Sequence, residues 1–469
     1  MDNQIMLITY ADSLGNNLKE LRRILAEQMD GVVGGVHILP FFPSSADRGF
    51  APIRYDKVDE AFGDFSDIKE LAAEHPLMFD FMVNHISRES PYFQDFIEKK
   101  DESAYRDFFI RYRDFWPGGE PTPAQVEAIY KRKPRAPAID VTFADGTSEK
   151  LWCTFSEDQI DLNTESDVTR AFIRETLTDM CRRGASMIRL DAFAYAVKKP
   201  GTGCFFIEPD IWTLLHDIED MVKPFGVDIL PEIHEHYSIQ LKIADKGFWV
   251  YDFALPMLVL HALYTGRGEA LKHWLDICPR KQFTTLDTHD GIGVVDVADL
   301  LPEEEIERAK EYLFTRGANV KKVYNTAAYN NLDIYQINCT YYSALGDDDQ
   351  AYLLARAIQF FAPGIPQVYY VGLLAGRNDI ALMEATKQGR DINRHYYSME
   401  EVAAETERPV VRKLFDMARL RNRHPAFHLE GECRTALDGS RLTITRAYQG
   451  AEATLEADLE THAFVIKHS

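Results

Sequence analysis

The stretch Met187-Ile188-Arg189-Leu190-Asp191-Ala192 is a short apolar run that ends near an acid. The same pattern returns in Ile229-Leu230-Pro231-Glu232 and in Thr285-Leu286-Asp287-Thr288-His289-Asp290. A buried parallel strand has this apolar character, and (β/α)8 enzymes collect their active-site residues at the carboxyl ends of such strands. The three runs therefore predict three strands that each present a carboxylate.

A fourth run, Leu77-Met78-Phe79-Asp80-Phe81-Met82-Val83-Asn84-His85, ends in a polar pair in the same way. Any single ending of this kind is also explained by a structural role, as the N-cap of the next helix. Four such endings in chain order, with gaps long enough for a helix between them, favour strands that alternate with helices. We therefore predict an α/β protein built on a (β/α)8, or TIM, barrel.

Eight segments qualify as barrel strands. The first two are separated by a predicted helix, Leu18–Met29, whose apolar side chains fall on one face. The predicted strands are Ile5–Tyr10, Gly35–Pro40, the run ending at His85, the runs ending at Asp191 and Glu232, Phe248–Phe253, the run ending at Asp290, and Gln367–Gly372.

The alternation of strands and helices is interrupted twice. After His85 a charged, aromatic segment with several Pro and Gly residues predicts a domain inserted after the third strand. The interruption after the seventh strand is too long for an ordinary loop and predicts a lid or small subdomain. Short alternating runs predict a small C-terminal β domain. The expected divisions are barrel segments 1–85, 165–291 and 347–426, an inserted domain 86–164, a subdomain or lid 292–346, and a β domain 427–469.

The chain of 469 residues has a formal net charge of −22. Nucleic acids and anionic membranes are polyanions, so the charge disfavours both as partners. The N-terminus lacks the basic and apolar segments of a signal peptide, and no run of ~18 apolar residues is present, which predicts a cytoplasmic protein. No cluster of oxygen ligands and no C-x-x-C motif stands out, so we expect neither a metal nor a cofactor.

Carboxylates at the mouth of a barrel suit glycosyl transfer, in which one attacks the anomeric carbon and another protonates the leaving oxygen. Arg189 and Asp191 share one side of a strand, so the guanidinium is expected to keep Asp191 ionised as a nucleophile. The apolar run before Glu232 favours the protonated form of a general acid. Asp290 fits a carboxylate that supports positive charge in the transition state. Three histidines are either substrate ligands or core-edge imidazoles bound by the backbone: His85, His234 and His289.

Four motifs resemble, in order, the barrel-strand motifs of the α-amylase superfamily of glycoside hydrolases. They are Asp80-Phe81-Met82-Val83-Asn84-His85, Arg189-Leu190-Asp191-Ala192, Glu232-Ile233-His234 and Thr288-His289-Asp290. Five longer segments resemble the sucrose phosphorylase branch of that superfamily over nearly the whole chain. These are Ile8-Thr9-Tyr10-Ala11-Asp12, His37-Ile38-Leu39-Pro40-Phe41-Phe42-Pro43, Tyr251-Asp252-Phe253-Ala254-Leu255-Pro256, Asp290-Gly291-Ile292-Gly293-Val294 and Gly389-Arg390-Asp391-Ile392-Asn393-Arg394-His395.

The resemblance implies a retaining double displacement that converts sucrose and phosphate into α-D-glucose 1-phosphate and D-fructose. It implies Asp191 as the nucleophile that forms a covalent glucosyl-enzyme, Glu232 as acid and base, and Asp290 as the stabiliser of the transition state. It also implies a set of substrate-binding residues, with three aromatic walls among the glucosyl contacts. This set is Asp47, Phe50, His85, Phe155, Arg189, Tyr195, His289 and Arg390 for the glucosyl ring, with His234 and Tyr335 as further contacts.

Phosphorolysis requires an anion site in this acidic protein. The cluster Lys131-Arg132-Lys133-Pro134-Arg135 is either a solvated face or, as the resemblance implies, the loop that supplies an arginine to phosphate. Arg132 and Arg135 both qualify, and we expect Arg132 to be the contact. A second acceptor loop contains Asp333 and Gln336, which the resemblance assigns to fructosyl hydroxyls. An aspartate at position 333 would repel a second phosphate, which favours plain sucrose over sucrose 6′-phosphate.

The presence of Asp191, Glu232 and Asp290 does not indicate which acceptor receives the glucosyl unit. A sucrose 6′-phosphate phosphorylase, or a retaining α-glucosidase or transglucosidase that uses water or a polyol, remains an alternative. A silent barrel of the same superfamily is disfavoured because all three acids are present. The expected partners are small molecules, and the chain is expected to be a monomer or a homodimer.

Overall fold

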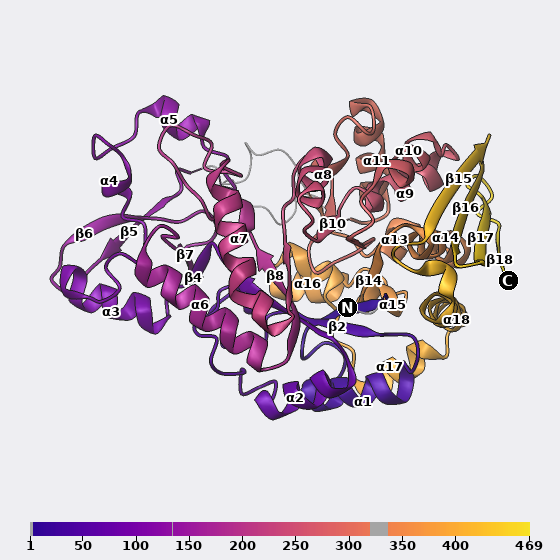
Figure 1. The fold of residues 1–469 in the computed structure, drawn as a ribbon, viewed down its shortest axis with the longest axis horizontal. Coiled ribbons are helices and arrows are strands. Elements are labelled where there is room, and N and C mark those ends of the chain that lie inside the picture. The colour runs from indigo at the N-terminus through magenta and orange to yellow at the C-terminus, as the bar shows by residue number, and fades with distance from the viewer. Residues whose placement is uncertain (1–2, 134, 319–335) are drawn as a thin grey trace. The chain divides into compact units, whose positions relative to one another are not determined.

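The computed structural model describes residues 3–133, 135–318 and 336–469 (Figure 1). Eight strands make one parallel sheet in the order β10-β11-β14-β1-β2-β3-β8-β9, which confirms the predicted (β/α)8 fold. Their bounds are β1 (Met6–Thr9), β2 (Gly35–Ile38), β3 (Leu77–Met82), β8 (Ala185–Asp191), β9 (Asp228–Pro231), β10 (Val250–Asp252), β11 (Gln282–Thr284) and β14 (Ile365–Tyr369).

The described chain forms two compact units. The second is Ile38–Ile233, and the first takes its described residues from the parts of the chain before and after it. In the first unit β1 and β11 both pair with β14, and β10 pairs with β11. In the second unit β8 lies between β3 and β9. All five pairings are parallel, as buried α/β sheets require.

The helices of the first unit follow apolar stripes in the sequence. The predicted helix at Leu18 is confirmed as α1 (Leu18–Gln28), which is capped by Asn17 and buries Leu18, Leu21, Ile24 and Leu25. The other elements are α8 (Tyr237–Asp245), α9 (Leu255–Thr265), α10 (Glu269–Ile277), β12 (Ile292–Gly293), α11 (Glu303–Thr315), β13 (Gln336–Ile337), α13 (Tyr341–Ala344), α14 (Asp349–Phe361), α15 (Tyr370–Leu373), α16 (Ile380–Thr386), α17 (Met399–Thr406) and α18 (Pro409–Arg423).

In the second unit the segment after β3 departs from the barrel pattern, as predicted. It builds antiparallel pairs in place of parallel ones and packs a small aromatic core around Trp152. The limits 86–164 of an inserted domain remain a prediction. The elements of this unit are α2 (Phe65–Glu74), β4 (His85–Ser87), α3 (Pro91–Lys99), α4 (Tyr112–Phe115), α5 (Pro123–Ala128), β5 (Ala138–Thr142), β6 (Ser148–Trp152), β7 (Gln159–Asp161), α6 (Asp167–Arg182) and α7 (Asp210–Val222).

The seventh barrel strand was predicted in the wrong place. The structure has β11 at Gln282–Thr284, and the segment 285–290 is the loop that follows it. The sequence pattern did not indicate a strand at 282–284, because a polar residue such as Gln282 is unexpected in a barrel core. Its side chain is nevertheless fully buried, and its amide donates to Pro363 O at 2.9 Å. The eighth strand, β14, likewise begins two residues earlier than predicted.

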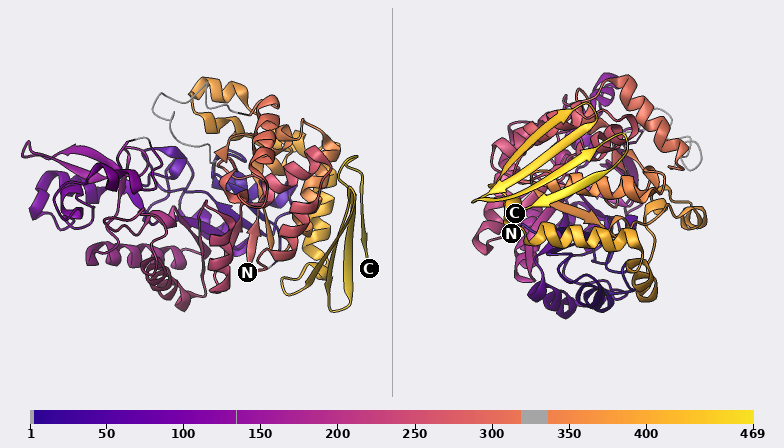
Figure 2. Two further views of the ribbon diagram at one scale, coloured as in Figure 1. Left: turned by 90° about the horizontal axis from the view of Figure 1, so that it is seen from above. Right: turned by 90° about the vertical axis from the view of Figure 1, so that its right-hand side faces the viewer.

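The chain ends in a four-stranded antiparallel sheet, which confirms the predicted C-terminal β domain (Figure 2). Alternate residues of the second strand, including Leu442 and Ile444, are fully buried, whereas their neighbours are partly exposed. No helix among the described residues is long and apolar enough to cross a membrane. The strands are β15 (Glu432–Asp438), β16 (Arg441–Tyr448), β17 (Ala451–Asp458) and β18 (Phe464–His468).

The fully buried Arg356 on α14 ties the loop after β11 to the helix layer. It donates to Asp287 Oδ2 at 2.7 Å, to the Tyr352 hydroxyl at 3.0 Å and to Gln359 Oε1 at 2.8 Å.

We expect Arg356→Met to lower the free energy of unfolding by about 3–5 kcal/mol in urea denaturation, because it leaves the buried Asp287 carboxylate without its cation. The double variant Arg356→Met/Asp287→Leu should recover part of this loss. Equal losses in both variants would contradict this role for the pair.

Candidate active site

Three carboxylates of the second unit surround one guanidinium. Arg189 Nη1 donates to Asp80 Oδ1 at 2.5 Å and to Asp191 Oδ1 at 2.9 Å, and its Nη2 lies 3.9 Å from Glu232 Oε2. The predicted contact between Arg189 and Asp191 on one side of β8 is therefore present. Asp80 was not among the predicted site residues. It faces Arg189 in the register of β3 and β8, and its signal in the sequence is an acid inside an apolar strand.

The prediction that Arg189 keeps Asp191 ionised needs correction. Burial raises the pKa of Asp191, and the neighbouring charges of Glu232 and Asp80 raise it further, against the opposing effect of the guanidinium. One cation is therefore shared by several buried carboxylates, so the group retains a proton more readily than a carboxylate in water. A pair in which one acid is protonated and the other ionised is what a retaining glycosyl transfer requires.

The backbone turn after Asp191 links this residue to Glu232. Ala192 has φ 50° and ψ 32°, a left-handed conformation that costs a non-glycine residue about 1–2 kcal/mol. The turn directs the Ala192 N–H to Glu232 Oε2 at 3.0 Å, while Leu190 O accepts from the Glu232 N–H at 3.0 Å. Backbone strain of this kind is concentrated at functional sites.

Five other predicted glucosyl contacts gather in the second unit. His85 Nε2 donates to Phe50 O at 2.9 Å, and its ring centre lies 5.5 Å from that of Phe155. Phe155 in turn lies 5.2 Å from Tyr195 in an edge-to-face arrangement. Asp47 is exposed. Burial lowers the pKa of His85, whereas the charge of Asp47 and that of a buried aspartate act in the opposite direction.

Lys198 is a positioning residue that was not predicted from the sequence. Its buried ammonium group lies 2.9 Å from Asp161 Oδ2 and donates to Asn84 Oδ1 at 2.8 Å and to Tyr195 O at 2.7 Å. These contacts hold the residue before His85 and the backbone of one aromatic wall. No local sequence pattern signals them, because the partners come from three separate parts of the chain.

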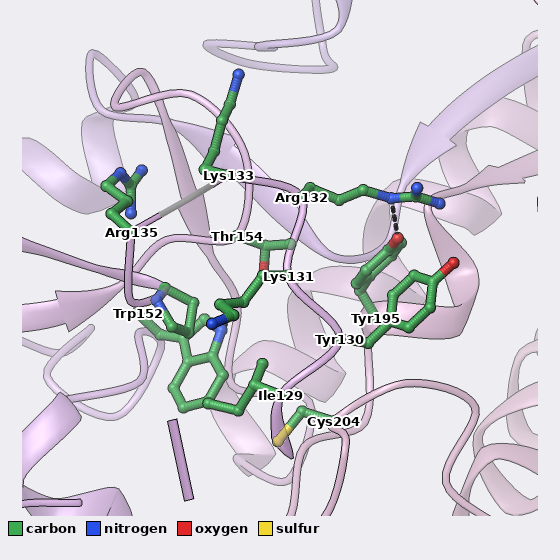
Figure 3. A pocket seen from close by; sticks show the side chains of 11 residues that line it. Ile129, Tyr130, Lys131, Arg132, Lys133, Arg135, Trp152, Thr154, Tyr195 and Cys204 are labelled. Atoms are coloured by element: carbon green, nitrogen blue, oxygen red, sulfur yellow. Dashed lines mark hydrogen bonds between the residues drawn. The ribbon is translucent and has the colours of Figure 1, made fainter. Parts of the chain in front are cut away.

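The basic cluster lines a pocket of the second unit, shown in Figure 3. Arg132 Nε donates to the Tyr195 hydroxyl. Its guanidinium carbon lies 5.2 Å from the ring centre of Tyr130 and 5.5 Å from that of Tyr195. Arg132 is thus held by a predicted sugar-binding wall, where it can meet an anion.

Arg135 has a different environment, although it lies only three residues further along the chain. Its Nη1 donates to the carbonyl oxygens of Ala136, Ala138 and Cys153 at 3.0, 3.3 and 3.1 Å. Its Nη2 donates to Phe155 O at 3.0 Å. These donors hold the backbone of the loop, so Arg135 is a structural residue and Arg132 is the candidate anion contact.

In the first unit, Asp290 lies on the loop after β11 among positive groups. Its Oδ1 is 3.3 Å from Arg390 Nη1, and its Oδ2 is 3.6 Å from His289 Nε2. Burial disfavours its charge, but the positive charges of His289, Arg390 and Arg394 outweigh burial and lower the pKa of Asp290. Arg394 was not predicted, and it also donates to His289 O from both Nε and Nη2. Asp290 is therefore ionised.

Gln336, a predicted acceptor contact, and His234, a predicted substrate contact, meet in the first unit. The Gln336 Nε2 atom lies 3.0 Å from His234 Nε2, and the His234 Nδ1 atom lies 3.4 Å from Asp296 Oδ2. Asp296 was not predicted as a site residue. The other two residues of this predicted loop, Asp333 and Tyr335, lie outside the described residues. Within each unit taken by itself, the described residues offer no group of three or more metal-ligand side chains.

Known proteins resemble this chain over most of its length. Residues 27–236 match the α-amylase catalytic domain. Sucrose phosphorylase of Streptococcus mutans is 60% identical over 429 residues, 92% of this chain and 89% of that protein. Glucosylglycerol phosphorylase of Marinobacter adhaerens is 44% identical over 428 residues, 91% of this chain and 88% of that protein.

A solved structure agrees with these relatives. The crystal structure of sucrose 6F-phosphate phosphorylase from Thermoanaerobacter thermosaccharolyticum matches with a TM-score of 0.95 and 42% identity, and the match covers 100% of this chain and 96% of that one. The fold, the three carboxylates and these relatives lead to one conclusion. The chain belongs to the α-amylase family, within the group that contains the sucrose phosphorylases.

Proposed function

We propose that the protein is a sucrose phosphorylase, which transfers a glucosyl unit reversibly from sucrose to phosphate with retention of configuration. The products are α-D-glucose 1-phosphate and D-fructose. The observation that carries the proposal is the position of Arg132, a guanidinium held on the aromatic wall residue Tyr195. A cation at this wall suits a phosphate acceptor, and a hydrolase that uses water has no need of it.

In the first half-reaction, an oxygen of Asp191 attacks the anomeric carbon of the glucosyl unit. A bond forms between carbon and carboxylate, and the bond to the fructosyl oxygen breaks as Glu232 donates a proton to that oxygen. Arg189 Nη1 donates to Asp191 at 2.9 Å, which orients the attacking carboxylate, and Glu232 acts as the general acid. Asp290 supplies a fixed negative charge that favours the oxocarbenium-like transition state.

In the second half-reaction, a phosphate oxygen attacks the glucosyl-enzyme and releases Asp191. Glu232, now ionised, accepts the phosphate proton. Arg132 binds the phosphate charge, and the loop that carries it is held by the contacts of Arg135 with backbone carbonyls.

The named relatives are all phosphorylases, and their names differ in the glucoside that they cleave. For this chain we propose plain sucrose, supported by 60% identity to a sucrose phosphorylase and by Asp333, which would repel a phosphorylated fructose. The proposed partners are sucrose, phosphate, glucose 1-phosphate and fructose. A cytoplasmic location and a monomeric or homodimeric state remain predictions.

The central test compares the basic residues of the pocket. We expect Arg132→Ala to raise the KM for phosphate by about 10- to 100-fold, because it removes a charge-assisted hydrogen bond. Release of fructose in the first turnover should change much less. Lys133→Ala is the matched control and should leave the KM for phosphate within about twofold of the wild-type value. Equal effects of the two substitutions would mean that the cluster acts only as a diffuse positive field.

The role of Glu232 is tested with α-glucosyl fluoride, whose leaving group needs no proton. We expect Glu232→Ala to lose sucrose turnover by about 10²- to 10⁴-fold but to retain fluoride release when azide is the acceptor. The product should be the α-glucosyl azide. Asp191→Ala should abolish this retaining reaction, and a β-azide from Glu232→Ala would remove Glu232 from its assigned role.

The pH dependence follows from the raised pKa of Asp191. The nucleophile must be ionised, so glucosylation is lost as the pH falls through a pKa that lies above the ordinary aspartate value of about 3.9. The nearby Glu232 charge contributes to this rise. We therefore expect Glu232→Gln to move the acidic limb of fluoride release to lower pH. Stopped-flow measurement of fluoride release across pH checks the direction, and an unmoved or upward-shifted limb would contradict the coupling.

A further inference from the structure

A chain of polar contacts in the first unit has a defined direction. The Gly291 N–H donates to Gln336 Oε1 at 3.4 Å, so the oxygen of this amide faces the backbone and its nitrogen faces away. Gln336 Nε2 then lies 3.0 Å from His234 Nε2. The pairing of β12 with β13, in which Gly293 stands opposite Gln336, holds the amide in place.

This direction determines which nitrogen of His234 carries the proton. An amide nitrogen only donates, so His234 Nε2 must be the acceptor in this arrangement. The proton of the neutral ring is therefore on Nδ1, which lies 3.4 Å from Asp296 Oδ2. A carboxylate accepts this hydrogen bond and favours this tautomer.

The absence of a side chain at Gly293 leaves room for the Asp296 carboxylate beside His234. Asp296 is fully buried, and a Cβ atom added to Gly293 would lie 2.2 Å from Asp296 Oδ2. A side chain at position 293 would therefore displace the carboxylate. The ring of His234 is also held from one face by Phe253, which stacks on it with centroids 3.8 Å apart.

We propose that Asp296 is a positioning and specificity-determining residue of the acceptor site. It holds the His234 proton on Nδ1, so that Nε2 offers a lone pair to a hydroxyl group of the acceptor sugar, in the place that the Gln336 amide takes in this structure. A hydroxyl donates to that lone pair, whereas a phosphate ester dianion has only acceptors to present. This inference rests on the proposed function, and it assigns to His234 a preference for an unphosphorylated sugar.

Other charged groups interact with His234 and Asp296, but the hydrogen bond between these two residues remains. Asp290 interacts electrostatically with His234, while Glu235 and Asp252 interact with Asp296. These three groups are all acids, and the Asp296 carboxylate is hydrogen-bonded to the ring at Nδ1. A substitution at Asp296 therefore changes the tautomer of His234 more directly than a substitution at any of them.

The test uses two aspartates that both contact a histidine. Asp296→Asn places an amide against Nδ1 that can donate, which moves the ring proton to Nε2. Asp299 Oδ2 lies 3.1 Å from His236 Nε2 at the surface, so Asp299→Asn is the matched control. With α-glucosyl fluoride as donor, each variant is offered fructose or phosphate as acceptor, so both acceptors react with the same glucosyl-enzyme.

We expect Asp296→Asn to raise the KM for fructose by about tenfold, the effect of one lost hydrogen bond, and the KM for phosphate by less than about threefold. Asp299→Asn should change neither. In a His234→Ala background, Asp296→Asn should have no further effect on the KM for fructose, because it acts through the ring. A ¹⁵N spectrum of the His234 ring should show the proton on Nδ1 in the wild type and on Nε2 in Asp296→Asn.

Equal losses for fructose and phosphate, or an additive effect with His234→Ala, would overturn the proposal and leave Asp296 as a structural residue. A wild-type His234 ring protonated on Nε2 would overturn it as well. Failure of the proposed function has a different signature. In that case the wild-type enzyme would release fluoride but transfer its glucosyl unit to neither fructose nor phosphate.

Discussion

The candidate catalytic residues of the second unit depend on one interaction, the guanidinium of Arg189 that they share. It contacts Asp80 on one strand and Asp191 on its own strand, and it lies near Glu232 after the next strand. A buried cation with several carboxylates cannot neutralise all of them equally. The result is a raised pKa at Asp191, in a group of acids of the kind that a retaining glycosyl transfer uses in its first step.

Asp191 in the second unit and Asp290 in the first have pKa values that are shifted in opposite directions. Burial dominates at Asp191, where one guanidinium is shared, and the pKa of this acid is raised. Positive groups dominate at Asp290, and its pKa is lowered despite burial. Two carboxylates that look alike in the sequence thus acquire pKa values shifted in opposite directions, because desolvation and neighbouring charge oppose each other. In the proposed reaction Asp191 forms a bond with the sugar, and Asp290 remains a fixed charge.

Arg132 and Arg135 are close in the sequence but have different environments in the structure. Both stand in a dense basic cluster, and the sequence pattern suits either of them for phosphate. In the structure Arg135 is bound by backbone carbonyls, whereas Arg132 extends to the aromatic wall at Tyr195 (Figure 3). The carbonyls come from residues 136 to 155, and their convergence on one guanidinium is a property of the folded loop.

Local pattern was enough to determine the barrel, the helix at Leu18, the C-terminal sheet and the candidate acids, since burial imposes an apolar period on each strand and helix. It failed at β11, where Gln282 is buried with its own hydrogen-bond partner, and it missed Asp80, Lys198 and Asp296. These residues act through partners distant in the sequence. The tertiary structure alone decided the opposite pKa shifts of Asp191 and Asp290, which arginine contacts the aromatic wall and which nitrogen of His234 accepts a hydrogen bond. These properties depend on distances between groups that only folding brings together.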